Sequence, residues 1–485
     1  MFKKAMAVLS LIVVLIITYL GLPQEVGAAQ TVEDIQDKGT LILGTSADYP
    51  PYEFHATIDG KDEIIGMDIS LAEAIADELG VNLQIEDLGF DALLPALEAG
   101  TVDMVIAGLS PTPEREKSVS FSKIYYEDKP SIVILDKNRD LYGNQESLAG
   151  HTVGAQTGSI QADFAEQVEG AETYFLGDIN QLVIALQTEK IEAMILTNST
   201  AQIYQENRGD LYIYEGDFEG GEVEGNAVAF PLGSDDLVEL ADGVIDEVHA
   251  DDQLETWLQE VSPYVELSED DEESGSFLSQ YWPLFWEGTK TTILVSVIGV
   301  FFGVILGVLL ALMRLSDQAV LSTLATAYIE FVRGTPLLIQ VMFIYFGLGM
   351  LVNIQAIAAG IIAISLNSGA YVAEIIRSGL SSIPVGQSEA SRSLGLSYIK
   401  TMRHIVFPQA LKNIWPALGN EFVTIIKESS IISTIGVAEL TYQTGIVQTQ
   451  SYKGILPLFI SMILYFILTF TLTKVLNHLE NKMSY

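Results

Sequence analysis

Residues 389–408, EASRSLGLSYIKTMRHIVFP, decide the fold of the second half of this chain. The segment is polar and basic, and long apolar runs flank it on both sides. Basic loops between hydrophobic spans lie on the cytoplasmic side of a membrane. The segment therefore predicts a membrane domain with a cytoplasmic loop, in which Gly395 permits a tight turn and Pro408 ends the segment before the next span.

Acidic residues are concentrated in the first half of the chain. Residues 1–275 carry 55 of the 64 acidic side chains and 12 of the 24 basic ones, whereas residues 276–485 carry 9 and 12. An acidic half followed by a slightly basic, apolar half indicates one domain in solvent and one in the lipid bilayer. The net charge of −40 repels nucleic acid, so no nucleic-acid partner is expected. The chain has no cysteine, so disulfide chemistry is excluded.

The N-terminus has the pattern of a secretory signal. Lys3 and Lys4 precede an apolar run over residues 5–22, and small residues at 27–29 offer a cleavage site. We expect residues 1–29 to be a signal peptide. An uncleaved anchor is the alternative, because the apolar run is long. In both cases residues 30–275 are exported.

Short β-type runs alternate with helical ones between residues 30 and 265. Residues 41–45 and 82–85 have the pattern of strands, and residues 69–79 that of an amphipathic helix. Such alternation predicts parallel βαβ units, and two α/β lobes fit it better than one large sheet. The expected extracellular substrate-binding domain, 30–265, divides into one lobe at about 30–128 and 226–265 and another at about 129–225.

A membrane domain is expected at residues 279–485, after an acidic, solvated linker at 266–278. Five crossings from an exported start place the C-terminus and most basic residues inside, in agreement with the positive-inside rule. The sequence thus predicts a multi-pass protein of the plasma membrane. Each predicted span has about the 20 apolar residues needed to cross a bilayer: 289–313, 325–351, 354–376, 414–435 and 455–476.

The segment AGLSPTPER, residues 107–115, is the strongest candidate for a ligand site in the first half. It follows a strand-like run, and an arginine beyond a strand end can hold a carboxylate with two parallel hydrogen bonds. The small residues at 107, 108 and 110 let backbone groups approach a ligand. Aromatic residues near other strand ends could pack against the ligand: Tyr49, Tyr52 and Phe90.

Several motifs occur in a fixed order: Gly44-Thr45, YPPYEF at 49–54, IGMDI at 65–69, GFD at 89–91 and the 107–115 segment. This order resembles the type II periplasmic-binding-protein fold, specifically the polar amino-acid binding family (family 3), over about residues 38–265. The resemblance implies that Arg115 and Ser110 hold the α-carboxylate of an amino acid, and that Gly108 and Ser110 accept from its α-ammonium. It further implies that Phe90, Tyr49 and Tyr52 pack the side chain, and that a second-lobe loop closes on the ligand with Gln156, Gly158 and Ser159.

One position departs from that family. Where its members have an acidic residue that pairs with the α-ammonium, this chain has Thr197. A neutral acceptor loses a charge-assisted bond of roughly 1.5–3 kcal/mol. Either another acid takes over, or the ligand is not a standard α-amino acid. Glutamine is the best prediction, and the alternatives are a basic amino acid, cystine, or betaine held by an aromatic cage.

Three ordered segments of the second half also point to a family. YIEFVRGTPLL at 328–338, LNSGAYVAEIIRSG at 366–379 and PQALKN at 408–413 resemble the polar amino-acid (His/Gln/Arg type) permease subunits of ABC transporters. The resemblance implies that residues 385–410 are the EAA-type coupling loop, which docks on a separate ATPase. The implied coupling residues are Glu389, Ala390, Gly395 and Pro408. Ser391 and Phe407 replace the usual Ala and Leu.

Polar residues at membrane depth face either a partner or a cavity. On that ground Asn367 and Glu421 are candidates for a translocation path, with structural pairing between helices as the equal alternative. The chain has no P-loop, so we expect a separate ATPase to supply the energy. The resemblance also implies a permease homodimer, because five spans make half a path.

The sequence as a whole predicts a binding protein fused to an ABC importer permease. The fold class is a two-lobed α/β domain followed by an all-α transmembrane domain. We expect neither enzymatic activity nor a cofactor or metal, because no acid–base constellation accompanies the predicted ligand site. A ligand-gated channel uses the same binding fold, but there the membrane spans interrupt the lobes.

Overall fold

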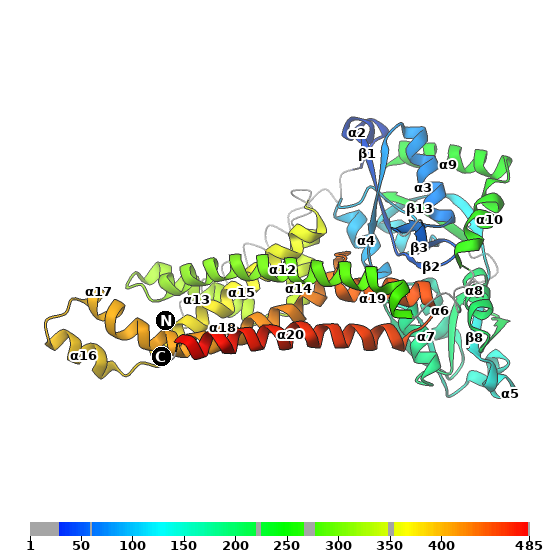
Figure 1. Cartoon of the computed structure of the whole chain (residues 1–485). Coiled ribbons are helices and arrows are strands. Elements are labelled where there is room, and N and C mark those ends of the chain that lie inside the picture. Colours follow the sequence, from blue (N-terminus) through cyan, green and yellow to red (C-terminus); the bar gives the residue numbers. More distant parts are fainter. Residues whose placement is uncertain (1–28, 59–60, 220–224, 266–276, 348–353, 484–485) are drawn as a thin grey trace.

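The computed structural model describes residues 29–58, 61–219, 225–265, 277–347 and 354–483. Figure 1 shows an α/β domain at one end of a set of long helices, with two short helices, α16 (Val385–Ser393) and α17 (Tyr398–Thr401), at the opposite end. The predicted signal peptide and nearly all of the predicted acidic linker lie outside the described residues.

The first lobe is built on a five-stranded sheet with the order β5-β1-β6-β13-β7. Strands β5 and β6 pair with β1 in parallel, and β13 is antiparallel to both of its neighbours. A three-stranded sheet, β2-β3-β4, stands beside it. The strands are β1 (Thr40–Thr45), β2 (Asp48–Tyr49), β3 (Glu53–Ile58), β4 (Lys61–Ile65), β5 (Asn82–Asp87), β6 (Met104–Val105), β7 (Val119–Glu127) and β13 (Gly225–Pro231), and the helices are α2 (Val32–Lys38), α3 (Met67–Leu79), α4 (Phe90–Glu98), α9 (Asp235–Ala250) and α10 (Gln253–Val265).

Helix α3 shows how the sequence produces these elements. Leu71, Ile75 and Leu79 recur every four residues and are buried, so one face of the helix packs on the sheet. The helix ends at Gly80, which adopts a left-handed conformation. Both features agree with the amphipathic pattern expected over residues 69–79.

The second lobe has its own five-stranded sheet, with the order β10-β9-β11-β8-β12. The chain passes from β7 of the first lobe to β8 of the second and returns to the first lobe at β13, so the chain crosses between the lobes twice. The two-lobed α/β fold expected from the sequence is therefore confirmed. Its elements are β8 (Pro130–Leu135), α5 (Arg139–Tyr142), β9 (Thr152–Gln156), α6 (Ile160–Gln167), β10 (Glu172–Leu176), α7 (Ile179–Gln187), β11 (Ala193–Thr197), α8 (Asn198–Arg208) and β12 (Leu211–Glu215).

The membrane-type domain is helical. Among the described residues, three helices are long and apolar enough to cross a membrane: α12 (Phe277–Arg314), α15 (Ala356–Ser381) and α20, which runs over Ile455–Met483. A fourth candidate is a pair bent by 110°, α13 (Ala319–Arg333) followed by Leu337–Gly347, which contains α14 (Leu337–Met342) and a π-helical turn. The helices that do not meet this test include α18 (Phe407–Glu428) and α19 (Leu440–Ser451).

Five crossings are therefore not confirmed: the structure has three candidate spans, or four with the bent pair. The predicted span at 325–351 breaks at Gly334-Thr335-Pro336, because a proline lacks the amide hydrogen that a continuous helix needs. The predicted span at 414–435 corresponds to α18 and a 3₁₀ turn (Ser429–Ile435), and its charged residues lower its hydropathy.

Candidate ligand site and docking face

A small pocket lies between the two lobes. Its lining residues come from the loop after β1, from β2 and β3, from the start of α4, from the end of β6 and from the second lobe: Ser46, Asp48, Tyr49, Glu53, Phe90, Ala107, Gly108, Gln156 and Gln161. Four of the predicted ligand residues, Tyr49, Phe90, Gly108 and Gln156, thus meet in one place. The cavity among them is only about 10 Å³, so the lobes must separate to admit an amino acid.

Direct hydrogen bonds join the lobes around this pocket. The Thr197 amide donates to the Tyr49 hydroxyl at 2.9 Å, and that hydroxyl donates to Thr197 Oγ1 at 3.0 Å. Asp48 Oδ2 accepts from the Ile179 amide at 2.9 Å. The described conformation is therefore closed. Thr197 lies at the interface between the lobes, but it does not line the pocket.

Arg115 follows the Ser-Pro-Thr-Pro turn and is half-buried at the edge of the pocket. Its guanidinium donates to the Ser110 carbonyl in its own lobe and, at 2.8 Å, to the Gly158 carbonyl in the other. The guanidinium carbon lies 5.9 Å from the centre of the Phe90 ring. A planar group with several donors in this position can hold a carboxylate between the lobes.

Other predicted ligand residues support the pocket from behind. Tyr52 is fully buried, stacks on Tyr49 at 5.6 Å and donates to Asp128 at 2.6 Å, so it does not line the pocket. Ser159 caps α6 by accepting from the Ala162 amide, and it donates to the Gln156 carbonyl. Ser110 is buried and its backbone carbonyl accepts from Arg115.

Sequence reasoning missed two acidic residues that line the pocket, Asp48 and Glu53. Burial and the neighbouring Asp68 raise the pKa of Glu53 well above its usual value. Burial also raises the pKa of Asp68 to about 6, although the Gly108 amide and the Tyr125 hydroxyl donate to it. The Glu53–Asp68 pair therefore carries about one negative charge at neutral pH. Asp48 directly precedes the YPPYEF run and Glu53 lies within it, so this motif could have pointed to both residues.

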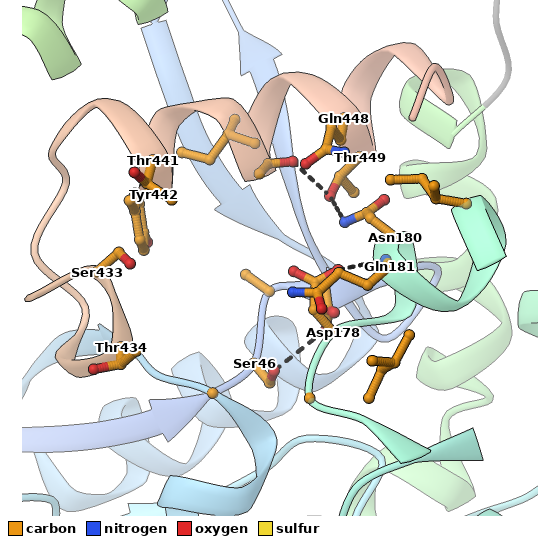
Figure 2. Close-up of a pocket in the computed structure, with 18 of the residues that line it drawn as sticks. Ser46, Asp178, Asn180, Gln181, Ser433, Thr434, Thr441, Tyr442, Gln448 and Thr449 are labelled. Carbon is orange, nitrogen blue, oxygen red and sulfur yellow. Dashed lines mark hydrogen bonds between the residues drawn. The ribbon is translucent and has the colours of Figure 1, made fainter. Parts of the chain in front are cut away.

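Both lobes dock on helix α19 of the membrane-type domain. Tyr442 donates its hydroxyl to Asp87 of the first lobe, and Asn180 of the second lobe donates to Thr449 at 2.9 Å. Figure 2 shows Asn180 and Thr449 facing each other, with Tyr442 further along the same helix. A cavity of about 730 Å³ lies between the lobes and α19, and it includes Ser46 and Asp48 in its lining.

His55 stands at the centre of the first-lobe contact. Its two ring nitrogens lie 2.8 Å from Asp62 and 3.1 Å from Asp87. Burial opposes protonation of His55, but the hydrogen bonds to both aspartates and their charges outweigh it and raise its pKa to about 9. The histidine is therefore a buried cation at neutral pH, and it offsets part of the acidic charge that faces Tyr442.

We expect the stability of the protein to fall as the pH rises through this value. The pKa of His55 is raised above its ordinary 6.5, so its contribution is complete below about pH 6.5 and is lost as the pH rises through about 9. The loss is on the order of 2–4 kcal/mol. Thermal unfolding of the full chain measures it, and His55→Gln should flatten the profile in this range. His151→Gln, at a histidine that packs on Tyr142, is the control and should leave the slope unchanged; equal slopes in all three proteins would contradict the assignment.

The two candidates for a translocation path differ in their surroundings. Asn367 is buried and donates to Gln340, whose amide in turn donates to the Val332 and Thr335 carbonyls at the bend between α13 and α14. Asn367 therefore helps to satisfy the backbone at this bend. Glu421 is half-buried on α18.

A cluster of charges joins three long helices of this domain. Glu374 of α15 accepts from Arg314 of α12 at 2.6 Å and from Arg377 of its own helix at 2.6 Å. Arg333, at the end of α13, lies 4.0 Å away. The cluster satisfies charged groups near the helix ends, as expected for ionisable residues in a membrane-type domain.

The predicted coupling loop forms two short helices. Gly395 lies between α16 and α17 with a φ of +85°, a conformation that favours glycine. Glu389 and Ala390 lie on α16, and Pro408 lies in the first turn of α18. The unusual Ser391 donates to the Ser388 carbonyl and to the Thr401 hydroxyl, so it joins α16 to α17. Leu394 and Ile399 are 85% and 75% exposed.

These features define a class of protein: a two-lobed solute-binding domain docked on its own helical permease. Residues 41–260 match the family of bacterial extracellular solute-binding proteins, family 3. Residues 303–484 match the binding-protein-dependent transport system inner membrane component. The chain belongs to the amino-acid ABC transporters, as a fusion of binding protein and permease, and the resemblance seen in the sequence is confirmed.

Relatives of the permease half are named for glutamine transport or for arginine transport. A putative glutamine transport system permease protein GlnP of Rickettsia felis is 39% identical over 212 residues, which cover 43% of this chain and 97% of that protein. The arginine transport system permease protein ArtQ of Bacillus subtilis is 39% identical over 206 residues, covering 41% and 93%. The solved amino-acid ABC transporter substrate-binding protein AbpA of Streptococcus pneumoniae is 32% identical, with a TM-score of 0.47, and the match covers 49% of this chain and all of that one.

Proposed function

We propose that the chain takes up a polar amino acid, captured by the two lobes and released into a path through the membrane domain. The observation that carries this proposal is the closed pocket, where Tyr49, Phe90 and Gly108 meet and Arg115 reaches from one lobe to the other. An arginine so placed provides the donors that a free α-carboxylate requires.

The substrate is glutamine or a basic amino acid. Glu53 supplies a carboxyl group at the pocket, whereas Thr197 supplies none. A carboxyl acceptor suits an ammonium, a guanidinium or a side-chain amide, because all three donate hydrogen bonds. The relatives named for glutamine and for arginine transport are compatible with both choices.

Transport requires partners. A separate ATPase binds the coupling loop, whose exposed Leu394 and Ile399 provide an apolar contact surface. Two copies of the chain form the path. The binding domain lies outside the cell, and α16, α17 and the C-terminus lie in the cytoplasm. The bent pair and α18 then complete five crossings with the three long apolar helices.

Calorimetric titration of the purified full chain tests the substrate. L-glutamine, L-arginine, L-cystine and glycine betaine are the ligands. Micromolar or tighter binding of glutamine or arginine is the expected result. Binding of betaine alone would contradict the proposal, because a trimethylated ammonium has no N–H to donate to the Glu53 carboxyl group.

A further inference from the structure

The segment from Ser46 to Asp48, at the start of β2, separates two cavities. On one side is the small pocket between the lobes, and on the other is the cavity of about 730 Å³ above α19. Ser46 and Asp48 line both. A change in the position of this segment therefore alters the ligand pocket and the docking face together.

Asp48 also holds the second lobe. Its Oδ2 accepts at 2.9 Å from the amide of Ile179, the first residue of α7. The amides at the start of a helix have no partners within the helix, and a side-chain oxygen that accepts from one of them stabilises the helix end. An aspartate of one lobe thus adds a second cap to a helix of the other, 131 positions away in the sequence, beside that helix's own N-cap, Asp178.

The permease contacts the immediate neighbours of this bond. Asn180, next to Ile179, donates to Thr449 of α19. Ala47, next to Asp48, donates its amide to Asp87 at 2.9 Å, and Asp87 accepts from Tyr442 of the same helix. Ile179 is therefore next to Asn180, which bonds to α19 directly. Asp48 is next to Ala47, which is linked to α19 through Asp87.

We infer that Asp48 is a positioning residue that couples closure of the ligand pocket to docking on the permease. Closed lobes place Asn180 and Asp87 where α19 can bind both, and α19 in turn holds α7 against Asp48. Because such coupling is reciprocal, docking on α19 slows release of the ligand, and movement of α19 away from α7 promotes it. The freed ligand then enters the cavity above α19. This inference rests on the proposed amino-acid site.

Dissociation of radiolabelled L-glutamine, or of L-arginine where glutamine does not bind, tests the inference on the full chain in nanodiscs. Asp48→Ala removes the cap, and we expect release to become at least about tenfold faster. Asp48→Asn keeps an oxygen that can accept from Ile179, so its release should be clearly slower than that of Asp48→Ala. Asp236→Ala is the matched control, because Asp236 accepts from the amide of Val32, the first residue of α2, far from both cavities.

The permease side is tested by Thr449→Val, which keeps the shape of the side chain and removes the acceptor for Asn180. We expect release to become about two- to fivefold faster. Thr444→Val on the same helix is the control, because its hydroxyl donates to the Leu440 carbonyl of its own helix and forms no hydrogen bond with either lobe among the described residues.

The possible outcomes are distinct. Equal release from the Asp48→Ala and Asp236→Ala variants would overturn the inference, and so would equal release from Thr449→Val and Thr444→Val. Release from Asp48→Asn as fast as from Asp48→Ala would also overturn it, because an acceptor for the Ile179 amide would then have no effect. Ile179→Pro removes the donor at a helix position that accepts proline, and it should match Asp48→Ala if the latter folds poorly. Absence of saturable binding in the wild type would instead reject the proposed function.

Discussion

Replacing Arg115 with alanine is expected to weaken amino-acid binding by at least about a hundredfold. The guanidinium spans the lobes at the pocket edge, and its donors lie where a ligand carboxylate would need them. Loss of two charge-assisted hydrogen bonds accounts for an effect of this size. Titration of the full chain with the bound amino acid measures it.

Arg139→Ala is the matched control for this prediction. Arg139 also lies over an aromatic ring, with its guanidinium carbon 4.0 Å from the centre of Tyr212, but it belongs to the surface of the second lobe. Binding by this variant should equal that of the wild type. Undiminished binding by Arg115→Ala would remove this arginine from the site.

Replacing Gly395 with aspartate is expected to abolish ATP-driven transport while the affinity for the amino acid stays unchanged. A β-carbon at Gly395 meets no atom of the described chain within 4 Å. The aspartate side chain therefore fits without a clash, but it strains the turn by about 1–2 kcal/mol because Gly395 has a φ of +85°. Its charge projects from the surface that we assign to the ATPase. Reconstitution with the ATPase partner, followed by measurement of ATP hydrolysis and uptake, provides the test.

Gly80→Asp is the control for the backbone strain. Gly80 has a similar φ of +71° at the end of α3, and an added β-carbon there also meets no atom within 4 Å. Both variants bear the same local strain, but only Gly395 belongs to the coupling loop. Equal transport by the two variants would show that this turn does not contact the ATPase.

The sequence predicted the lobes and part of the pocket because the relevant signals are local. Phe90 and Gly108 each follow a strand closely, Arg115 lies in the loop between β6 and β7, and parallel strands of one sheet end near one another. The contact of Asp48 with Ile179 could not be predicted in this way, since it depends on how two lobes close. The same holds for Thr449 and Asn180, which come from different domains.

The membrane domain shows the limit of counting apolar residues. Pro336 was visible in the sequence, but the apolar residues on either side of it gave the appearance of one continuous span. Asn367 was a candidate for the path because amides are rare at membrane depth. Its actual partner, Gln340, lies 27 positions away and binds carbonyls that only the bend leaves free.

The contacts of Glu374 have a mechanical consequence. One carboxylate holds arginines from α12 and from α15 itself, with the arginine at the end of α13 close by. Helix α15 runs on to Ser381, only a few residues before α16 begins. A force applied to α16 therefore reaches α15 within a few residues. We expect such a force to move α12 and α13 together with α15, because arginines at the ends of both helices lie within 4.0 Å of the Glu374 carboxylate.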